Sequence, residues 1–213
     1  MAATAAASRL TEAHRLAQIR LGVTTVQQML AAWPLLDVDD LDGTSPRWVA
    51  INRALIGAQH RQSVTLAADY LRTFRALELG SIERITPVLG TLDPVAVTTS
   101  LIVTGPVRVK NAAAKGLDLA AAMERAAASS AAAGMRHALA GGRDTIDETV
   151  KADPKAIGWA RVTSGKACEF CSMLADRGAV YGDDTAHFDA HDGCSCTAEP
   201  AYASRAPADL TPS

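Results

Sequence analysis

The sequence is poor in aromatic side chains and lacks long hydrophobic runs. Phe, Trp and Tyr make up only 4% of the 213 residues, although 48% are hydrophobic. The core must therefore be built mainly from Ala, Leu, Val and Ile, whose side chains favour closely packed helices. No apolar run reaches the roughly 18 residues that a membrane span needs. We expect a largely helical globular protein with no membrane contact.

The sequence also has little net charge, and we expect no secretory leader. The formal net charge of -2 gives no overall field that would draw the chain onto nucleic acid or an anionic membrane. The opening MAATAAASRLTEAHR turns polar without an apolar h-region or a cleavage site. We therefore expect a reducing, intracellular setting, where clustered cysteines are more often metal ligands or reactive thiols than disulfides.

Three dipeptides in which a capping residue precedes proline are expected to start helices. The capping side chain accepts backbone N–H groups, and proline suits the first helical turn. The dipeptides are Ser45-Pro46, Asp93-Pro94 and Asp153-Pro154. Helical spacing of apolar residues predicts one long helix from Pro46 to Leu79. Only a short helix is expected after Pro94, because the residues around it are rich in β-branched side chains and breakers.

A second long helix is expected in the alanine-rich segment from Asp118 to Ala140, since alanine is the best helix former. Asp118 can cap this helix, and Gly141-Gly142 is expected to end it. Asp144 is then expected to cap a shorter helix through TIDETVK.

One face of the first long helix carries several arginines with few acidic residues to balance them. This pattern is typical of a solvated helix face, and it also fits contact with DNA or with an acidic partner surface. The arginines are Arg47, Arg53, Arg61, Arg72 and Arg75.

A few single residues stand out from the helical pattern. His14, His60 and His137 have no acid or thiol at ligand spacing, so we expect them at the surface or as helix caps. Trp33 and Trp48 flank the acidic loop DVDDLDGTSP and are expected to anchor it by packing. The loop lacks the terminal Glu of a calcium-binding loop, so we expect a solvated turn.

After Pro154 the pattern changes from helical to alternating. GWARVTSG, AVYG and CTAEPAY are short strand candidates, and EFCSMLADRG between them is expected to form a short helix. We divide the chain into a flexible N-terminus (1–9), an α-helical body (10–150), a small α+β zinc-binding unit of ribbon or knuckle type (151–202) and a flexible tail (203–213).

All four cysteines lie in the α+β unit, together with a histidine at ligand spacing. The spacing C-x2-C-x19-H-x2-C-x-C lets one thiol pair converge on an ion and a second short group complete a tetrahedron of S and N donors. Such a donor set is typical of structural zinc. The candidate ligands are Cys168, Cys171, His191, Cys194 and Cys196.

Five donors compete for about four places. Cys168 and Cys171 are assigned as ligands, because no other thiol pair can supply the first half-site. In the second half-site, His191 and Cys194 repeat the tight-turn spacing, whereas Cys194 and Cys196 would face the same side of a strand. A site of three thiolates and the imidazole of His191 is favoured. A site of four thiolates stays open, and so does the choice between Cys194 and Cys196.

Other chemistries fit the spacing less well. A zinc deaminase needs a His-x-Glu motif before its thiol pair, and a thioredoxin-like redox site would leave the second pair unexplained. A catalytic zinc would keep one position open for water and need a nearby base, for which Asp189, Asp192, Glu199 or His187 can be considered. The acidic surroundings disfavour a DNA-reading zinc finger. We expect structural zinc without enzymatic activity, with a zinc-dependent nuclease or protease as the alternative.

Two segments, GWARVTSGKACEFCSMLADRGAVYG and HDGCSC, carry a resemblance to a known family. They are similar to the paired C-x2-C and H-x2-C-x-C signature of the Mu F-like minor head proteins of tailed bacteriophages, over residues 142–202. Where the common motif of that family has a proline after the histidine and a basic residue between the last two thiols, this sequence has Asp192 and Ser195.

The resemblance implies a structural virion protein that is synthesised in the bacterial host cytoplasm and acts in head assembly. Its implied place is inside the capsid or near the portal, and its implied partners are the portal, the scaffold or the major capsid protein. Contact with packaged DNA through the arginine-bearing helix would fit that place. The resemblance also implies zinc at the motif positions, which are Cys168, Cys171, His191, Cys194 and Cys196.

Overall fold

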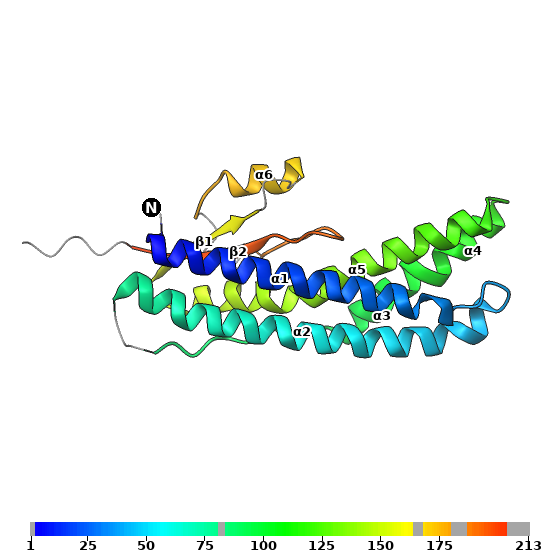
Figure 1. Cartoon of the computed structure of the whole chain (residues 1–213), viewed down its shortest axis with the longest axis horizontal. Coiled ribbons are helices and arrows are strands. Elements are labelled where there is room, and N and C mark those ends of the chain that lie inside the picture. Colours follow the sequence, from blue (N-terminus) through cyan, green and yellow to red (C-terminus); the bar gives the residue numbers. More distant parts are fainter. Residues whose placement is uncertain (1–2, 81–83, 164–167, 180–186, 204–213) are drawn as a thin grey trace, which may run out of the picture.

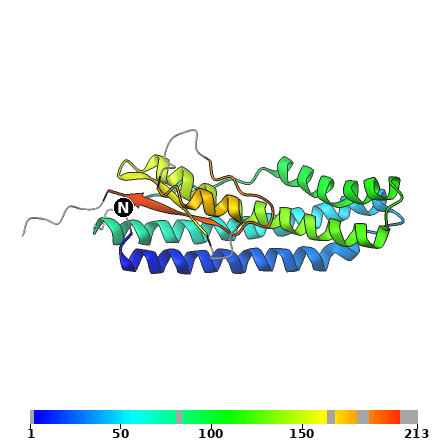
Figure 2. The ribbon, with the colours of Figure 1, turned by 90° about the horizontal axis from the view of Figure 1, so that it is seen from above.

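The protein is an elongated bundle of three long helices (Figure 1). The computed structural model describes residues 3–80, 84–163, 168–179 and 187–203. The long helices are α1 (Ala5–Ala32), α2 (Leu41–Leu79) and α5 (Leu119–Ala152), and each packs against the other two. Helix α5 runs parallel to α2 and antiparallel to α1 (Figures 1 and 2). None of the described helices is long and apolar enough to span a membrane.

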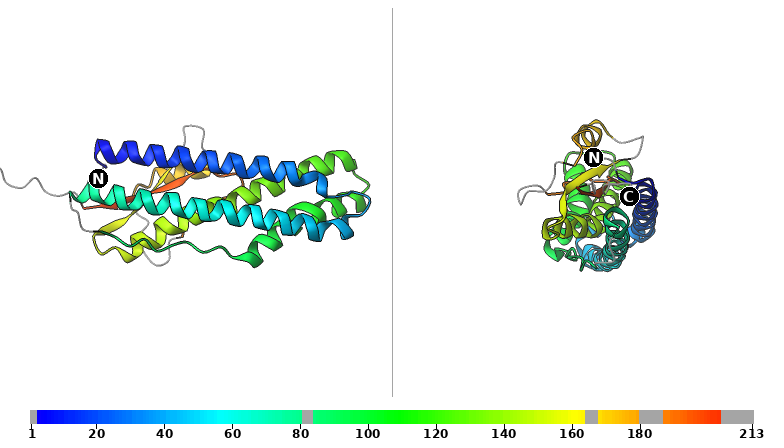
Figure 3. Two further views of the ribbon diagram at one scale, coloured as in Figure 1. Left: turned by 60° about the horizontal axis from the view of Figure 1, so that its bottom comes forward. Right: turned by 90° about the vertical axis from the view of Figure 1, so that its left-hand side faces the viewer.

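Shorter elements lie toward the two ends of the bundle. At one end are η1 (Trp33–Leu35), α3 (Pro94–Ile102), η2 (Val103–Val107) and α4 (Arg108–Ala114). Nearer the other end are β1 (Ala156–Val162), α6 (Glu169–Ala175) and β2 (Thr197–Tyr202). Figure 3 shows that the two strands and α6 lie along one side of the bundle, so the bundle supports the region that contains the cysteines.

The two strands pair antiparallel, from Ala156 opposite Tyr202 to Val162 opposite Thr197. The strands expected in GWARVTSG and CTAEPAY and the helix expected in EFCSMLADRG are confirmed. Most of AVYG and the tail from residue 204 onward lie outside the described residues. The expected fold class, mainly helical with a small C-terminal α+β unit, is confirmed.

Side-chain caps determine where the helices begin. Asp93 and Asp118 cap α3 and α5 as expected. The expected start at Ser45-Pro46 is wrong. The carboxylate of Asp40 accepts a backbone N–H of the first turn at 2.9 Å, so α2 begins at Leu41 and the proline lies within the helix.

At the N-terminus, α1 begins at Ala5 because the Thr4 hydroxyl accepts a backbone N–H of its first turn. Residues 5–9, which we expected to be flexible, are therefore helical.

The expected end of the second long helix is wrong, because α5 continues through Gly141-Gly142 to Ala152. Both glycines lie where α5 touches the other long helices. A Cβ atom on Gly141 would lie 2.7 Å from the backbone oxygen of His60, and one on Gly142 would lie 2.6 Å from Nε2 of Gln18. Glycine therefore permits close helix approach here instead of ending the helix. Asp144, expected as a cap, lies within α5.

Asp153-Pro154 is also not a helix start, because Asp153 directly follows α5 and is held in a buried ion pair. Arg75 Nε donates to its carboxylate at 2.7 Å, and the Tyr202 hydroxyl donates at 3.2 Å. Burial by itself raises the pKa of Asp153, but the hydrogen bonds from Arg75 and from the backbone N–H of Lys155 outweigh it and lower the pKa. This contact joins α2, α5 and β2.

Arg75 is consequently not part of the exposed arginine face that the sequence suggested. Its side chain is only 7% exposed. The other four members of that face, Arg47, Arg53, Arg61 and Arg72, are exposed.

The three histidines on the long helices are buried, so the expectation of surface or capping positions is wrong. His14, His60 and His137 are at most 8% exposed. His14 stacks on Tyr70, with 4.4 Å between ring centroids. Each long helix packs against two others, so a wider part of its surface is buried than in a helical pair.

The two tryptophans next to the acidic loop pack as expected. The rings of Trp33 and Trp48 meet edge to face with 5.4 Å between centroids, and Trp48 is fully buried. They anchor the junction between α1 and α2.

The C-terminal elements share one hydrophobic cluster with the bundle, which we call the shared core. The bundle contributes Ala7, Ala67, Tyr70, Leu71, Phe74, Ile146 and Val150. The C-terminal elements contribute Trp159, Cys171, Phe188, Cys194, Cys196, Ala198 and Tyr202. Three of the four cysteines are thus part of the packing that joins the sheet to the helices, and α5 itself extends past residue 150.

Candidate metal centre

The first half-site is built by the start of α6. Cys168 is the N-cap of this helix, and its Sγ accepts the backbone N–H of Cys171 at 3.5 Å. An N-capping position points the Cys168 side chain back over the first turn, which is where Cys171 lies. The C-x2-C spacing therefore brings both sulfurs to one side of α6.

The second half-site is a tight turn fixed on α5. Gly193 has a φ of 75°, a left-handed conformation that glycine adopts without strain, and the N–H of Cys194 donates to the carbonyl of His191 at 3.1 Å. The N–H of Gly193 donates to the carbonyl of Ala132 at 3.2 Å, and Arg136 Nε donates to Asp192 at 2.7 Å. Helix α5 therefore sets the position of the second group of donors.

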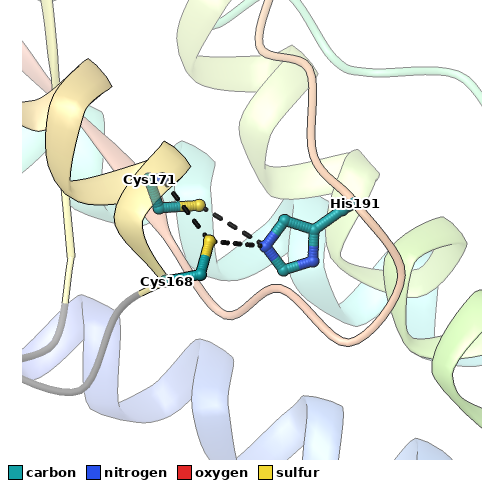
Figure 4. Close-up of side chains that lie close together, drawn as sticks. All are labelled: Cys168, Cys171 and His191. Atoms are coloured by element: carbon teal, nitrogen blue, oxygen red, sulfur yellow. Dashed lines mark hydrogen bonds between the residues drawn. The ribbon is translucent and has the colours of Figure 1, made fainter.

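The two half-sites converge (Figure 4). Nε2 of His191 lies 3.1 Å from the sulfur of Cys168 and 3.6 Å from that of Cys171. The sulfurs of Cys171 and Cys194 are 3.7 Å apart. Two groups, each with donor atoms within 4.8 Å of one another, overlap at Cys171. One is Cys168, Cys171 and His191, and the other is Cys171, Cys194 and Cys196.

Two of these separations match those around a tetrahedral ion, whereas the 3.1 Å between Cys168 and His191 is shorter. Bonds of about 2.3 Å from zinc to sulfur and about 2.0–2.1 Å to nitrogen place neighbouring donors about 3.8 Å apart for two sulfurs and about 3.5 Å apart for sulfur and nitrogen. The Cys171–Cys194 and Cys171–His191 separations, 3.7 and 3.6 Å, agree with these values. All five donors expected from the sequence thus lie in two overlapping groups that could hold a metal ion.

Burial and hydrogen bonding give the donors different properties. Cys171, Cys194 and Cys196 are buried, whereas Cys168 and His191 are exposed, so the cluster opens to solvent on one side. Nδ1 of His191 lies 2.9 Å from the carbonyl oxygen of Asp192. This contact raises the pKa of His191 and leaves Nε2 facing the sulfurs, as in histidines that bind metals.

The thiols also differ in acidity. A hydrogen bond from the Cys196 thiol lowers the pKa of Cys194 to about 4, and the same bond raises the pKa of Cys196. Burial raises the pKa of Cys171 to about 11, and the backbone N–H at the start of α6 lowers the pKa of Cys168. One thiolate is therefore favoured in each half-site, and the thiolate is the form that binds metal ions.

The comparisons with known proteins assign the chain to a family. The model of the VG15 protein family matches residues 1–210. The chain belongs to the VG15 protein family. No curated protein and no solved structure matches it.

In this VG15 family chain, a buried arginine that the sequence did not reveal supports the second half-site. Arg143 is 2% exposed, and its Nε and Nη2 donate to the carbonyl oxygens of Cys196 and Cys194 at 3.0 and 2.6 Å. Burial lowers the pKa of Arg143, and the nearby thiols Cys194 and Cys196 oppose this effect. The sequence did not indicate that Arg143 contacts this half-site, because Arg143 lies about 50 positions before its partners.

A second buried arginine lies beside the same turn. Arg161 of β1 donates through Nη2 to the carbonyl of Asp189 at 2.7 Å, and its guanidinium lies 3.9 Å from the ring centroid of Phe188. Trp159 stacks on the same Phe188 ring, with 5.1 Å between centroids. The alternation in GWARV does indicate that these two side chains lie together, because it places Trp159 and Arg161 on the same face of the strand.

The side chains considered as catalytic bases lie in separate environments. His187 is 3.8 Å from Asp147, in a group with Glu148 that borders a surface pocket of about 520 Å³. The Asp147 carboxylate already accepts from Trp159 Nε1 at 2.8 Å and from Lys151 at 2.9 Å.

The remaining candidate bases also differ in their surroundings. Asp192 is paired with Arg136. Asp189 contributes its backbone carbonyl to Arg161. Glu199 is half-buried on β2, where burial raises its pKa.

Proposed function

We propose that this VG15 family chain is a minor head protein of a tailed bacteriophage, a structural virion component whose C-terminal unit is held by one zinc ion. The observation that carries the proposal is the convergence of all five donors of the Mu F-like signature, against a face of the bundle that they help to bury. A motif that is only sequence coincidence has no reason to assemble in space.

The proposed ligands are Cys168, Cys171, His191 and Cys194. Separations of 3.1, 3.6 and 3.7 Å link these donors in a chain, from Cys168 to His191, from His191 to Cys171 and from Cys171 to Cys194. Cys196 then remains beside the site and donates its thiol hydrogen to Cys194, consistent with its raised pKa. Structural zinc contributes about 10 to 16 kcal/mol in small peptides, which is enough to fix a unit with a modest core of its own.

The role is architectural. Four protein ligands leave no open position for the water molecule that a catalytic zinc activates. Asp192 is also engaged with Arg136, and the Asp147 carboxylate beside His187 is engaged with Lys151 and Trp159. Both observations favour binding over turnover and weaken the alternative of a nuclease or protease.

The proposed partners are the portal, the scaffold or the major capsid protein, and the proposed destination is the virion after synthesis in the host cytoplasm. Contact with packaged DNA would use the exposed arginines of α2. Arg47, Arg53 and Arg61 suit this contact best, because Arg72 is paired with Asp69 and Arg75 is buried.

The metal content of purified protein tests the zinc site. We expect one zinc ion per chain by elemental analysis, retained in Cys196→Ser and lost in Cys171→Ser. The two residues are a matched pair, since both are buried thiols of the same cluster. Retention after His191→Ala together with loss after Cys196→Ser would instead indicate four thiolate ligands, and zinc-free wild-type protein would refute the metal site.

The virion assignment has its own test. Mass spectrometry of purified particles of the phage that encodes this chain is expected to find it at low copy number relative to the major capsid protein. Deletion of its gene is expected to reduce the yield of filled heads. Particles that lack the chain and assemble in normal yield would contradict the assignment without bearing on the zinc site.

A further inference from the structure

We propose that Arg143 is the counter-charge of the metal centre, so that metal binding and the buried guanidinium stabilise each other. This inference rests on the metal site proposed above. It assigns a role to a residue 25 positions before the first ligand and outside the metal-binding motif.

The position of Arg143 is unusual for a charged residue. The side chain is 2% exposed, and its Nη1 has no hydrogen-bond partner. Among the residues that the structure describes, no carboxylate forms an ion pair with it. A buried cation without an anion is strongly unfavourable, so the fold needs a negative charge near this guanidinium.

The metal centre supplies that charge. A Zn²⁺ ion bound by three thiolates and one neutral imidazole carries one net negative charge, which a single guanidinium offsets. Arg143 reaches the centre through the carbonyls of Cys194 and Cys196, one a proposed ligand and the other its neighbour. The same contacts fix the backbone of the second half-site, as groups behind metal ligands commonly do.

Arg161, which also lies near the Phe188 ring, reinforces the arrangement. Arg143 lies 5.3 Å and Arg161 3.9 Å from the centroid of that ring. Arg161 is 5% exposed, and its Nε and Nη1 have no hydrogen-bond partner. Its Nη2 donates to the carbonyl of Asp189, two residues before His191. Two buried cations thus hold the backbone on both sides of the ligand-bearing turn.

The proposal makes a thermodynamic prediction that a purely structural role does not. If Arg143 compensates the centre, replacing it must destabilise the zinc-loaded protein more than the metal-free protein, and the difference appears as lost zinc affinity. We expect Arg143→Met to weaken zinc binding by about 10- to 100-fold, the usual range for groups behind metal ligands. Competition with a chromophoric chelator measures the affinity, and urea unfolding in EDTA measures metal-free stability.

Two further variants separate charge from packing. Arg143→Lys keeps the positive charge but not the two parallel N–H donors, so we expect it to retain most of the affinity that Arg143→Met loses. Arg75→Met removes a buried arginine that has its own carboxylate in Asp153. It is expected to lower metal-free stability and leave zinc affinity within about twofold of wild type.

The outcomes are distinguishable. Unchanged zinc affinity in Arg143→Met overturns the inference, and so does an Arg143→Lys variant as weak as Arg143→Met, because charge would then not be the cause. Wild-type protein that binds no zinc overturns the metal site itself.

Discussion

Two arginines three residues apart on α2 have opposite environments. Arg75 is buried and paired with buried Asp153, whereas Arg72 pairs with Asp69 at the surface. Removing one partner of a buried pair costs about 3–5 kcal/mol because the other charge is left unpaired, while an exposed pair contributes about 0–1 kcal/mol. Burial, not the presence of a salt bridge, decides how much each arginine stabilises the fold.

We therefore predict that Asp153→Asn lowers the free energy of unfolding by about 3 kcal/mol. Asp69→Asn, its exposed counterpart, is expected to change it by less than about 1 kcal/mol. Urea unfolding of both variants at neutral pH measures the difference. Equal effects would mean that the contact joining α2, α5 and β2 adds little to stability.

His14 makes stability depend on pH. Burial lowers its pKa from 6.5 to about 4, partly opposed by a backbone hydrogen bond to Leu66. Between these values the unfolded chain binds a proton that the folded chain does not, so the free energy of unfolding falls as the pH falls. We expect wild type to lose about 2 kcal/mol more than His14→Phe between pH 7 and pH 5.

Urea unfolding at the two pH values tests this expectation. Asp144, whose pKa burial raises to about 6, acts in the opposite direction, but it is present in both proteins and cancels in the comparison. Parallel pH profiles for the two proteins would contradict the role of His14.

The five donors of the candidate site were predictable because ligand spacing is a local property of the chain. Cys168 with Cys171, and His191 with Cys194, lie on single turns whose geometry follows from the sequence. Arg143 was not predictable, because only the folding of α5 against the second half-site brings it there. Its need for a counter-charge depends on burial, which a single sequence does not display.

At the scale of elements, capping residues in the sequence predicted some helix starts correctly and others wrongly. Asp93 and Asp118 cap helices as expected. Ser45-Pro46 does not start a helix because Asp40 caps α2 earlier, and Asp153-Pro154 does not because Arg75 holds Asp153 at the end of α5. Gly141-Gly142 does not end a helix because it lies where α5 contacts the other long helices. A glycine pair ends an isolated helix, but between closely packed helices it permits contact.

This difference predicts opposite effects for two glycine substitutions. Gly57 of α2 has only ordinary contacts around a potential Cβ, the nearest atom being 3.6 Å away, so Gly57→Ala is expected to stabilise by about 0.5–1 kcal/mol through helix propensity. Gly141→Ala places a Cβ 2.7 Å from the backbone oxygen of His60 and is expected to destabilise by about 1–3 kcal/mol. Thermal unfolding of the two variants compares them directly, and stabilisation by both would refute the close contact.

At the scale of the whole molecule, the shared core couples the metal centre to the bundle. Cys171, Cys194 and Cys196 pack in the same cluster as Tyr70 and Phe74 of α2. Removing a metal ion from this centre should therefore loosen more than the sheet and α6.

Hydrogen exchange with and without a chelator tests the coupling. We expect chelation to accelerate amide exchange in β1, β2 and α6, and also around Tyr70 and Phe74, since local stability follows the contacts of each segment. Amides of α3 and α4, at the other end, serve as the internal control. Acceleration limited to the C-terminal elements would show that the two parts are energetically separate.

The continuity of α5 gives the molecule a fixed internal distance. At a rise of 1.5 Å per residue, its 34 residues span about 51 Å. Its contacts extend from η2 and α4 to β1 and β2, and α1 and α2 pack along it. Helix α5 therefore fixes the distance between the two ends of the bundle. Two molecules docked at its opposite ends would be set at one spacing, and an insertion of a few residues in α5 would change both their separation and their relative rotation.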